Sequence, residues 1–275
     1  MVILSSYTFE NIRLLLLSGD GRHPDGLGHN TGQVGQNFMT KMFAHVAALF
    51  PNQVFNRHTG PSAQSIILDD FLADDFDSVA YGFIGGATPS VENQFLPLQI
   101  SRETLPPDTP GWGQPYKDHL RQWQNLGVIR LQPDTLPYRG NFLDLDPVYG
   151  DRSGLRLPVV RITYDMQPNE HRLAAWMEGQ AEEILRAMGA AKMWRGPRFT
   201  GVGSSHDLGG CRMGEDPATS VVNPDLRLHD TPGVYVFSGA VFPSCPGVNP
   251  TLTMWALGLW AAEKLIERLR RGEEV

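Results

Sequence analysis

Apolar positions along this chain have helical spacing in some segments and form short strand-like runs in others. This pattern divides the chain into three parts. Residues 2–4 form a short apolar run that predicts a buried strand. Residues 8–17 place Ile12, Leu15 and Leu16 on one face of a helix, with Thr8 as a candidate cap. A glycine-rich segment follows up to residue 35 and predicts a loop.

The middle of the chain has short apolar runs separated by proline and glycine, a pattern typical of an antiparallel sheet with long loops. Two helices are predicted within this region, at residues 115–126 and 169–188, because their apolar residues have helical spacing. The runs that predict strands are QSIILDDF, SVAYGFIGG, QFLPLQI, GVIRLQP and LPVVRITYDM.

The last part returns to glycine turns, a strand at residues 234–238 and a helix at residues 250–270. Asn249 is a preferred cap residue, and Pro250 is a preferred first helical residue. The fold class expected is therefore α+β: a mostly antiparallel sheet with helices, flanked by the two ends of the chain. The final helix has a broad apolar face made of Leu252, Trp255, Ala256, Leu259, Ala262, Leu265, Ile266 and Leu269.

Length and charge limit the classes of protein further. A chain of 275 residues with a net charge of −7 is long enough for one large or two small domains. It lacks the basic stripe of a nucleic-acid-binding protein. No apolar run reaches the roughly 18 residues of a membrane helix, and Glu10 and Arg13 interrupt the N-terminal apolar segment, which is unlike a signal peptide. Two cysteines, Cys211 and Cys245, favour core thiols over a disulfide framework and leave a single bridge open.

Two residues in the last part are candidates for chemistry. His206 precedes a glycine-rich turn, and imidazole is the side chain that titrates nearest neutral pH, so it is a candidate general base. A histidine satisfied by backbone groups fits the same pattern. Asn249 would either cap the last helix or present its amide to a substrate oxygen. The start of that helix offers free N–H groups and partial positive charge, which stabilise a nearby negative charge.

Other kinds of site fit the sequence less well. His206, Cys211, His229 and Cys245 are separated by 5, 18 and 16 positions, which match no common zinc pattern. The acidic run at residues 69–77 lacks the spacing and the closing glutamate of a calcium loop. No Gly-x-Ser-x-Gly elbow of a serine hydrolase is present. We therefore expect no metal site.

Several separated segments, in this order, resemble the C-terminal signature of the glucose–methanol–choline (GMC) family of flavoprotein oxidoreductases. They are HDLGGCRMGEDPATSVVNPDLRLHD, GVYVFSGAVFPS and NPTLTMWALGLWAAEKLI. VILSSYTFENIRLLLLSG and GHNTGQVGQNFMTK are similar, more weakly, to earlier segments of the family. Within the family, the chain is most similar to the flavin subunits of gluconate 2-dehydrogenases and related sugar or polyol dehydrogenases.

The resemblance implies an activity and a catalytic pair. The family's catalytic histidine falls on His206, and its second catalytic residue falls on Asn249. The implied reaction is FAD-dependent oxidation of a sugar or polyol CH–OH group, in which His206 takes the hydroxyl proton while hydride passes to flavin N5. Asn249 would hold the alcohol oxygen.

The resemblance also implies cofactor contacts and a domain arrangement. Gly239 and Ala240 would approach the pyrophosphate–ribityl chain of FAD, and Pro250 and Thr251 the isoalloxazine ring. The implied domains are a partial FAD-binding domain at residues 1–44, a substrate-binding domain at residues 45–198, and a return to the FAD-binding domain at residues 199–275.

One family element is absent from the sequence. The chain has no Gly-x-Gly-x-x-Gly segment between a strand and a helix, which holds the ADP half of FAD. The alternative expectation is therefore a truncated or split, non-catalytic fragment that needs a missing N-terminal FAD-binding half.

Partners and location are implied by the resemblance alone. Beside the sugar or polyol substrate, the expected partners are the missing N-terminal segment, a small subunit or a cytochrome c subunit. A gluconate-dehydrogenase-like protein would lie on the periplasmic side of the inner membrane through a partner. The expectation otherwise is a cytoplasmic protein.

Overall fold

The chain folds as two compact units in the computed structural model, which describes residues 1–29, 31–56, 65–92 and 97–273. The first unit contains residues 1–41, 135–165 and 201–275, and the second contains residues 42–134 and 166–200. Residues 135–165 therefore lie in the first unit, although they fall within the substrate-binding domain expected at residues 45–198.

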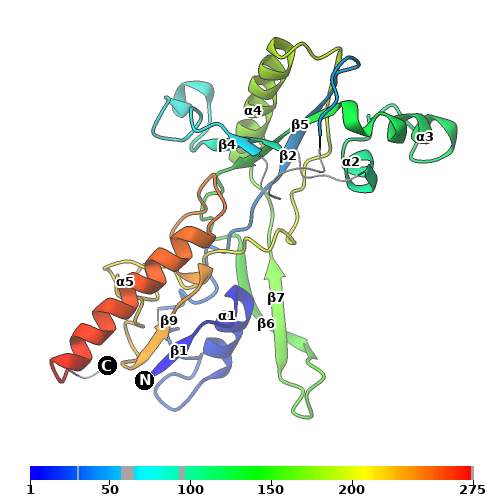
Figure 1. Ribbon diagram of the computed structural model, residues 1–275. Helices are drawn as coiled ribbons and strands as arrows, with labels where there is room; N and C mark the ends of the chain where they lie inside the picture. The colour runs from blue at the N-terminus through cyan, green and yellow to red at the C-terminus, as the bar shows by residue number, and fades with distance from the viewer. Residues whose placement is uncertain (30, 57–64, 93–96, 274–275) are drawn as a thin grey trace. The chain divides into compact units, whose positions relative to one another are not determined.

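The first unit brings the two ends of the chain together. Its first and last strands pair in parallel, with Ile3 opposite Tyr235, and two longer strands form a separate antiparallel hairpin beside its first helix. In Figure 1 the last helix runs beside the parallel pair. The elements of the first unit are β1 (Val2–Leu4), α1 (Thr8–Leu17), β6 (Phe142–Gly150), β7 (Pro158–Thr163), β9 (Val234–Val236), η3 (Gly239–Val241) and α5 (Thr251–Arg270).

The core of the first unit forms where α1 packs on the glycine-rich loop. Ile12 and Leu15 of α1 are buried with Phe38 and other apolar residues of this unit. Two loop glycines have positive φ and lie where no side chain fits. A Cβ on Gly26 would lie 2.5 Å from the Leu15 carbonyl oxygen, and one on Gly35 would lie 2.0 Å from that of Leu143. The glycines thus let the loop return to the helix and the hairpin.

The predictions for α1, for a strand at residues 2–4 and for the last helix are confirmed, but the burial differs. Val2 and Ile3 are 53% and 43% exposed, so the expectation of a buried first strand was wrong. Within the described part of α5, only Ala261 and Leu265 are buried. Most of its apolar face is therefore not covered by the described residues.

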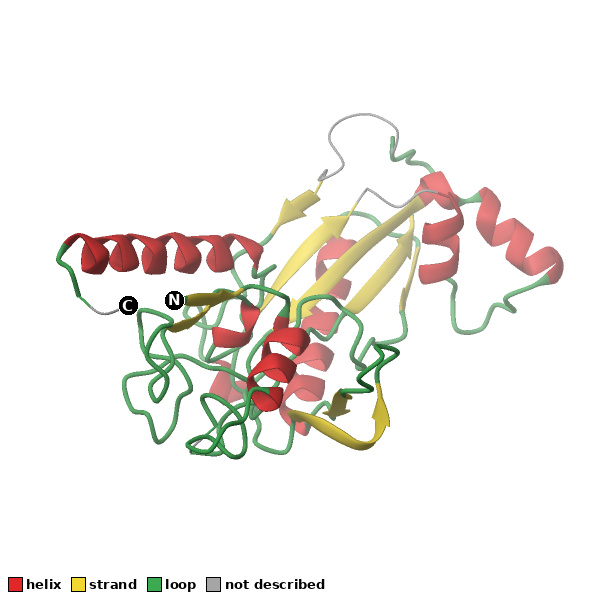
Figure 2. Cartoon of the chain, turned by 90° about the horizontal axis from the view of Figure 1, so that it is seen from below, coloured by secondary structure: helices red, strands yellow, loops and turns green. Residues whose placement is uncertain are grey.

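The second unit is built around a five-stranded antiparallel sheet with the order β3-β4-β5-β2-β8. Figure 2 shows this sheet together with the helices of the same unit. The elements are β2 (Ala44–Leu49), β3 (Ser65–Ile67), η1 (Ser78–Tyr81), β4 (Ala87–Glu92), α2 (Pro97–Glu103), α3 (Gly113–Arg121), η2 (Trp123–Asn125), β5 (Leu126–Pro133), α4 (Pro168–Ala187) and β8 (Lys192–Arg195).

The two faces of this sheet differ in what they carry. Arg195 pairs with Val46 across two strands, and its guanidinium reaches Glu178 of α4 at 3.3 Å. Because cross-strand partners share a face, α4 covers the face that carries Val46. The opposite face carries His45 and Arg130, which are also cross-strand partners.

Some elements of the second unit differ from the sequence prediction. The SVAYGFIGG run contains the 3₁₀ helix η1 instead of a strand, and the described part of QFLPLQI belongs to helix α2, which begins at Pro97. The helix predicted at 115–126 is shorter and is followed by η2. Strand β2, with the sequence AHVAAL, was missed because alanine is a weak strand former.

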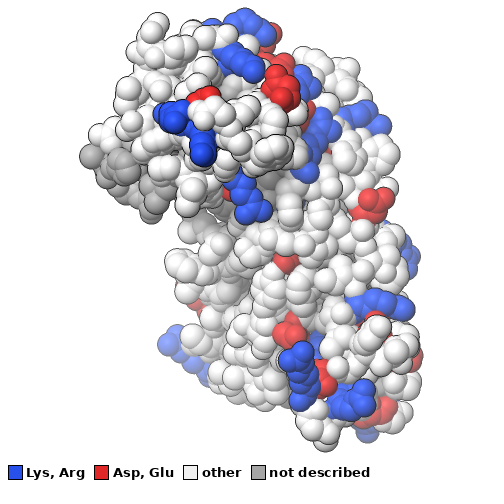
Figure 3. Space-filling model, turned by 90° about the vertical axis from the view of Figure 1, so that its right-hand side faces the viewer, with Lys and Arg blue, Asp and Glu red and all other residues white. Residues whose placement is uncertain are grey.

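Two surface properties bear on function. On the face shown in Figure 3, acidic and basic side chains are interspersed instead of forming one basic patch. Among the described residues, no helix is both long enough and apolar enough to cross a bilayer.

Candidate functional site

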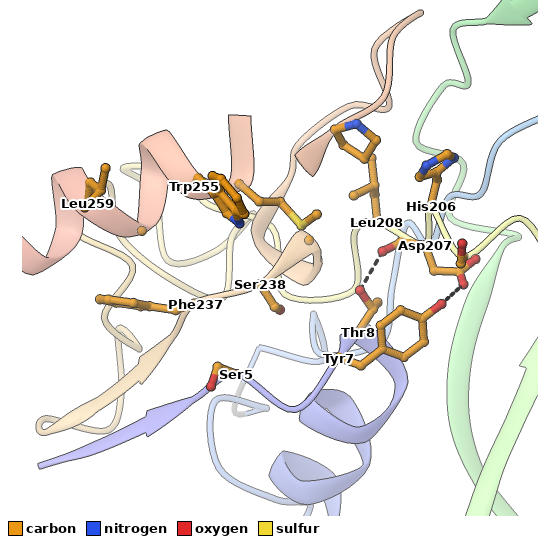
Figure 4. Close-up of a pocket in the computed structure, with 15 residues that line it drawn as sticks. Ser5, Tyr7, Thr8, His206, Asp207, Leu208, Phe237, Ser238, Trp255 and Leu259 are labelled. Carbon is orange, nitrogen blue, oxygen red and sulfur yellow. Dashed lines mark hydrogen bonds between the residues drawn. The ribbon is translucent and has the colours of Figure 1, made fainter. Parts of the chain in front are cut away.

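A cavity of about 710 Å³ in the first unit contains the candidate histidine (Figure 4). Its wall is formed by the junction of β1 and α1, the turn before Leu208, the segment after β9, and the first turns of α5. The residues that line it are Ser5, Tyr7, Thr8, Ser205, His206, Asp207, Leu208, Phe237, Ser238, Gly239, Pro250, Met254, Trp255, Gly258 and Leu259.

His206 is held by a tight turn. Its backbone N–H donates to Ser204 Oγ at 3.1 Å, and Ser204 Oγ lies 2.9 Å from Thr40 Oγ1. Ser205 has φ +56°, a left-handed conformation that reverses the chain just before the histidine. The side chain of His206 is half-buried in the cavity wall.

Asp207 anchors the histidine to the start of α1. The Tyr7 hydroxyl donates a hydrogen bond to Asp207 Oδ2, and Thr8 Oγ1 donates to the Asp207 carbonyl oxygen at 2.6 Å (Figure 4). Burial raises the pKa of Tyr7 far above its usual value, and the hydrogen bond to Asp207 and the charge of that carboxylate raise it further. The phenol therefore stays protonated and remains a donor to Asp207.

The residues after Asp207 are fixed by backbone pairing. Leu208 exchanges two backbone hydrogen bonds of 2.8 Å with Met39, and the Gly209 N–H donates to the Gly239 carbonyl oxygen at 3.1 Å. Gly209 has φ +78°, and a Cβ there would lie 2.3 Å from the Asn37 carbonyl oxygen. The glycine after Leu208 is therefore required for the close approach of two backbones.

The electrostatic surroundings keep the His206 imidazole neutral. Desolvation lowers its pKa below 6.5, the positive charge of buried Lys41 lowers it further, and Asp207 raises it in part. A neutral imidazole at pH 7 is able to accept a proton. The site therefore has the protonation state that a general base requires.

The Ser238–Gly239–Ala240 segment forms another wall of the cavity. Ser238 Oγ accepts hydrogen bonds from Asn11 Nδ2 at 2.8 Å and from the Ala240 N–H at 3.2 Å. A Cβ on Gly239 would lie 2.7 Å from Leu208 Cδ2, so the close packing requires glycine. Gly239 lines the cavity, whereas Ala240 is fully buried behind it.

The remaining predicted residues lie at the start of α5, and only one of them lines the cavity. Pro250 lines the cavity and is the N-cap of α5, which has no side-chain cap hydrogen bond. Thr251 and Asn249 are exposed and lie outside the cavity wall. Asn249 forms no side-chain hydrogen bond within the described part of the chain, so it does not cap the helix. The structure thus brings His206, Gly239 and Pro250 together and leaves the other three predicted residues outside the wall.

Several residues of this site were missed by the sequence analysis. Tyr7, Thr8 and Lys41 are far from His206 in sequence; they lie in the N-terminal segments that resemble the family, but no pattern in those segments singled them out. Asp207 is adjacent to His206, and this adjacency was the available signal. Trp255 was assigned to an apolar helix face, but it lies at the cavity and is 68% exposed.

The two cysteines belong to the core of the first unit. Both are buried and neither forms a disulfide, as the sequence favoured, and burial raises the pKa of Cys211 to about 12. A thiol with such a pKa is unreactive at neutral pH. In the described ranges, no cluster of three His, Cys, Asp or Glu residues is arranged to hold a metal ion.

Comparisons with known proteins identify the family of this chain. Residues 137–258 match the family described as GMC oxidoreductase. The gluconate 2-dehydrogenase flavoprotein of Pantoea cypripedii is 36% identical over 98% of this chain and 44% of its own length. The fructose dehydrogenase large subunit of Gluconobacter japonicus is 29% identical over 98% of this chain and 48% of its own length. A crystal structure of formate oxidase has the same fold, with a TM-score of 0.58, 16% identity, and coverage of 95% of this chain and 53% of that chain.

The chain therefore belongs to the GMC oxidoreductase family of FAD-dependent flavoproteins. It is similar to the C-terminal portion of the gluconate 2-dehydrogenase flavoprotein and of related sugar dehydrogenases. The chain spans about half the length of the curated relatives it matches.

The cavity fits one part of the family's cofactor. Phe237, Met254 and Trp255 give it aromatic and apolar walls suited to a planar ring. The uncapped start of α5 adds helix-terminal N–H groups, which favour negative charge. This sequence has no Gly-x-Gly-x-x-Gly loop to hold the ADP half of FAD. The residues present therefore suit the ring end of the cofactor.

Proposed function

We propose that the protein oxidises a CH–OH group of a sugar or polyol with FAD as its cofactor, and that His206 is the base. The observation that carries this proposal is one cavity that contains a neutral histidine and the uncapped start of a helix. The first unit, which contains both ends of the chain, would be part of the FAD-binding domain.

The residues of this chain would handle the proton of the alcohol. The His206 imidazole accepts it, and the bonds from Tyr7 and Thr8 to Asp207 keep the adjacent histidine in position. Burial of the imidazole, and after it the charge of buried Lys41 in the same unit, lowers the pKa of His206, so that the base form is available. When bound, FAD supplies a hydride acceptor at N5.

Asn249 is proposed as the partner of the alcohol oxygen. Its side chain is not used as a helix cap, so its amide is available to a substrate. An amide N–H would stabilise the oxygen as its proton leaves. The role of Asn249 requires its side chain to turn toward the cavity when substrate binds.

Cofactor contacts are proposed for four residues. The backbones of Gly239 and Ala240 would approach the pyrophosphate–ribityl chain, because this segment has no bulky side chain between it and the cavity. Pro250 and Thr251 would lie at the isoalloxazine ring, where the N–H groups at the start of α5 favour the negative charge of a reduced ring.

The substrate class and partners are proposed from the relatives' names. A gluconate 2-dehydrogenase and a fructose dehydrogenase indicate a sugar or sugar-derived substrate. The term "large subunit" in the second name supports a small subunit as partner. A cytochrome c subunit is proposed from the family resemblance alone. A partner of this kind would place the protein on the periplasmic side of the inner membrane. The comparisons give no support to the alternative of a non-catalytic fragment.

A visible absorption spectrum of the protein tests the proposal. The expected result is a bound-flavin spectrum after addition of FAD, which bleaches when a sugar or polyol is added without oxygen. A protein that holds FAD and is bleached by none of D-gluconate, D-fructose, D-glucose and D-sorbitol would contradict the proposed substrate class.

A further inference from the structure

A second cavity, of about 430 Å³, lies wholly within the second unit. Its polar lining comes from His45 of β2, Arg130 of β5, and Arg102 and Glu103 at the end of α2. This volume is within the range of small-molecule sites. No motif in the sequence marks it.

The cavity opens on the face of the sheet opposite α4. Arg130 pairs with Ser90 on one side and with His45 on the other, so the three side chains form a row across β4, β5 and β2. Strands β5 and β2 are interior strands of the sheet. Polar side chains in such a position are costly unless they bind a partner or a ligand.

Arg130 is held in a fixed orientation. Its Nη2 donates to Glu103 Oε2 at 3.0 Å, and its guanidinium lies 5.7 Å from the centre of the Phe43 ring. Arg102, the residue before Glu103, is exposed and forms no ion pair with a described residue. The cavity therefore has two guanidinium groups and one carboxylate.

His45 adds no charge to this balance. Burial lowers its pKa; the charge of Arg130 lowers it as well, while Glu103 and Glu178 raise it. Its Nε2 lies against Gly196, where a Cβ would be only 1.9 Å away. His45 therefore contributes an uncharged side chain to the wall. With two guanidinium groups and one carboxylate, the net charge of the lining is positive.

Apolar groups form the remaining wall. The rings of Phe43 and Phe199 lie 6.5 Å apart with an interplanar angle of 40°, and Pro197 lies beside them. Flat apolar surfaces of this kind contact the C–H groups of a carbon chain, while the guanidinium groups face its polar end.

We propose that this cavity binds a sugar acid, with its carboxylate held by Arg102 and Arg130 and its carbon chain against Phe43. The carboxylate follows from the lining, because guanidinium matches a planar carboxylate with paired hydrogen bonds. The inference that the ligand has a hydroxylated carbon chain rests on the proposed function. Binding to this cavity is a property of the second unit and does not require flavin.

Calorimetric titration of the protein without flavin tests the proposal. D-gluconate and D-sorbitol have the same six-carbon skeleton and differ at the end that carries the carboxylate. The expected result is that gluconate binds at least about tenfold more tightly than sorbitol. Equal affinities, or no heat of binding with gluconate, would overturn the assignment.

Arginine variants locate the binding. R102Q and R130Q are expected to weaken gluconate binding about tenfold or more. R186Q is the matched control, because Arg186 pairs with Glu183 on the exposed side of α4. R130Q leaves Glu103 without this partner. If circular dichroism shows that R130Q is unfolded, the gluconate affinity of R102Q, a variant at an exposed position, is the deciding measurement. Wild-type affinity in R102Q would contradict the proposal.

One further variant separates this inference from the proposed function. H206A is expected to bind gluconate with unchanged affinity, because His206 lies in the first unit. Loss of flavin reduction in H206A with gluconate binding retained would support both assignments. Flavin reduction in a protein whose arginine variants bind gluconate normally would leave the proposed function standing and overturn the arginine site.

Discussion

The two units place their polar side chains in different ways. In the first unit, His206 and its neighbours lie on turns, and backbone hydrogen bonds and glycines hold those turns against distant segments. In the second unit, His45 and Arg130 lie on strands, and the register of the sheet brings them together. A site on turns is marked by local residue patterns, whereas a site made by register has no such mark in the sequence.

Substitution of Gly209 by alanine tests the dependence of the first unit on close backbone approach. The residue has φ +78°, and a Cβ would lie 2.3 Å from the Asn37 carbonyl oxygen. We expect Gly209→Ala to lower the free energy of unfolding by about 3–5 kcal/mol, measured by urea denaturation. Gly201→Ala is the matched control, since nothing lies within 4 Å of its Cβ position. Equal stabilities of the two variants would show that the turn is not constrained.

Gly196→Ala is the corresponding change in the second unit. Its Cβ would lie 1.9 Å from His45 Nε2, so the imidazole must move. We expect a loss of about 2–3 kcal/mol in the free energy of unfolding. Because the obstacle is a side chain and not a backbone, the double variant with His45→Ala should recover part of this loss. No recovery would mean that the strain lies elsewhere.

Tyr7→Phe removes one hydrogen bond from the first unit without changing its shape. Asp207 is buried, and its Oδ1 has no hydrogen-bond partner among the described residues, so the Tyr7 hydroxyl is its main support. We expect a loss of about 1–3 kcal/mol in stability, measured by thermal or chemical denaturation. Tyr149→Phe, at an exposed position, should change stability by less than about 0.5 kcal/mol.

The pH dependence of flavin reduction is the smallest of these effects near neutrality. The pKa of His206 is lowered below 6.5, mainly by desolvation, and the base form is the neutral one. The rate should therefore be constant from about pH 7 upward and fall as the pH is lowered through that pKa. A rate that rises steadily from pH 7 to pH 9 would indicate a base other than this histidine.

The sequence predicted much of the first unit and less of the second. Helix α1 was predicted at its observed bounds because its apolar residues repeat with helical spacing and a glycine-rich loop follows. His206, Gly239 and Pro250, which the sequence motifs and the family resemblance had singled out, line the same cavity. The exposure of β1 and α5 was not predicted, because an apolar pattern shows which face avoids water but not whether a neighbour covers it.

The second unit shows why the rest could not be predicted. The SVAYGFIGG run has the composition of a strand, yet a capping aspartate and a left-handed glycine enclose a 3₁₀ turn there. The pairing of Ser90, Arg130 and His45 depends on which strands become neighbours, and the sequence alone does not specify strand order. Tyr7 and Asp207 are 200 positions apart in the sequence, so their contact could not be predicted either.

The central claim is that His206 is the base of a flavin-dependent oxidation, and anaerobic stopped-flow reduction of the FAD-loaded protein tests it most directly. H206A should retain bound flavin, and its reduction by substrate should be at least about a hundredfold slower than in the wild type. H23A, which changes a histidine paired with Asp20 in a loop of the same unit, should react at the wild-type rate. Reduction of H206A at a rate close to that of the wild type would contradict the account.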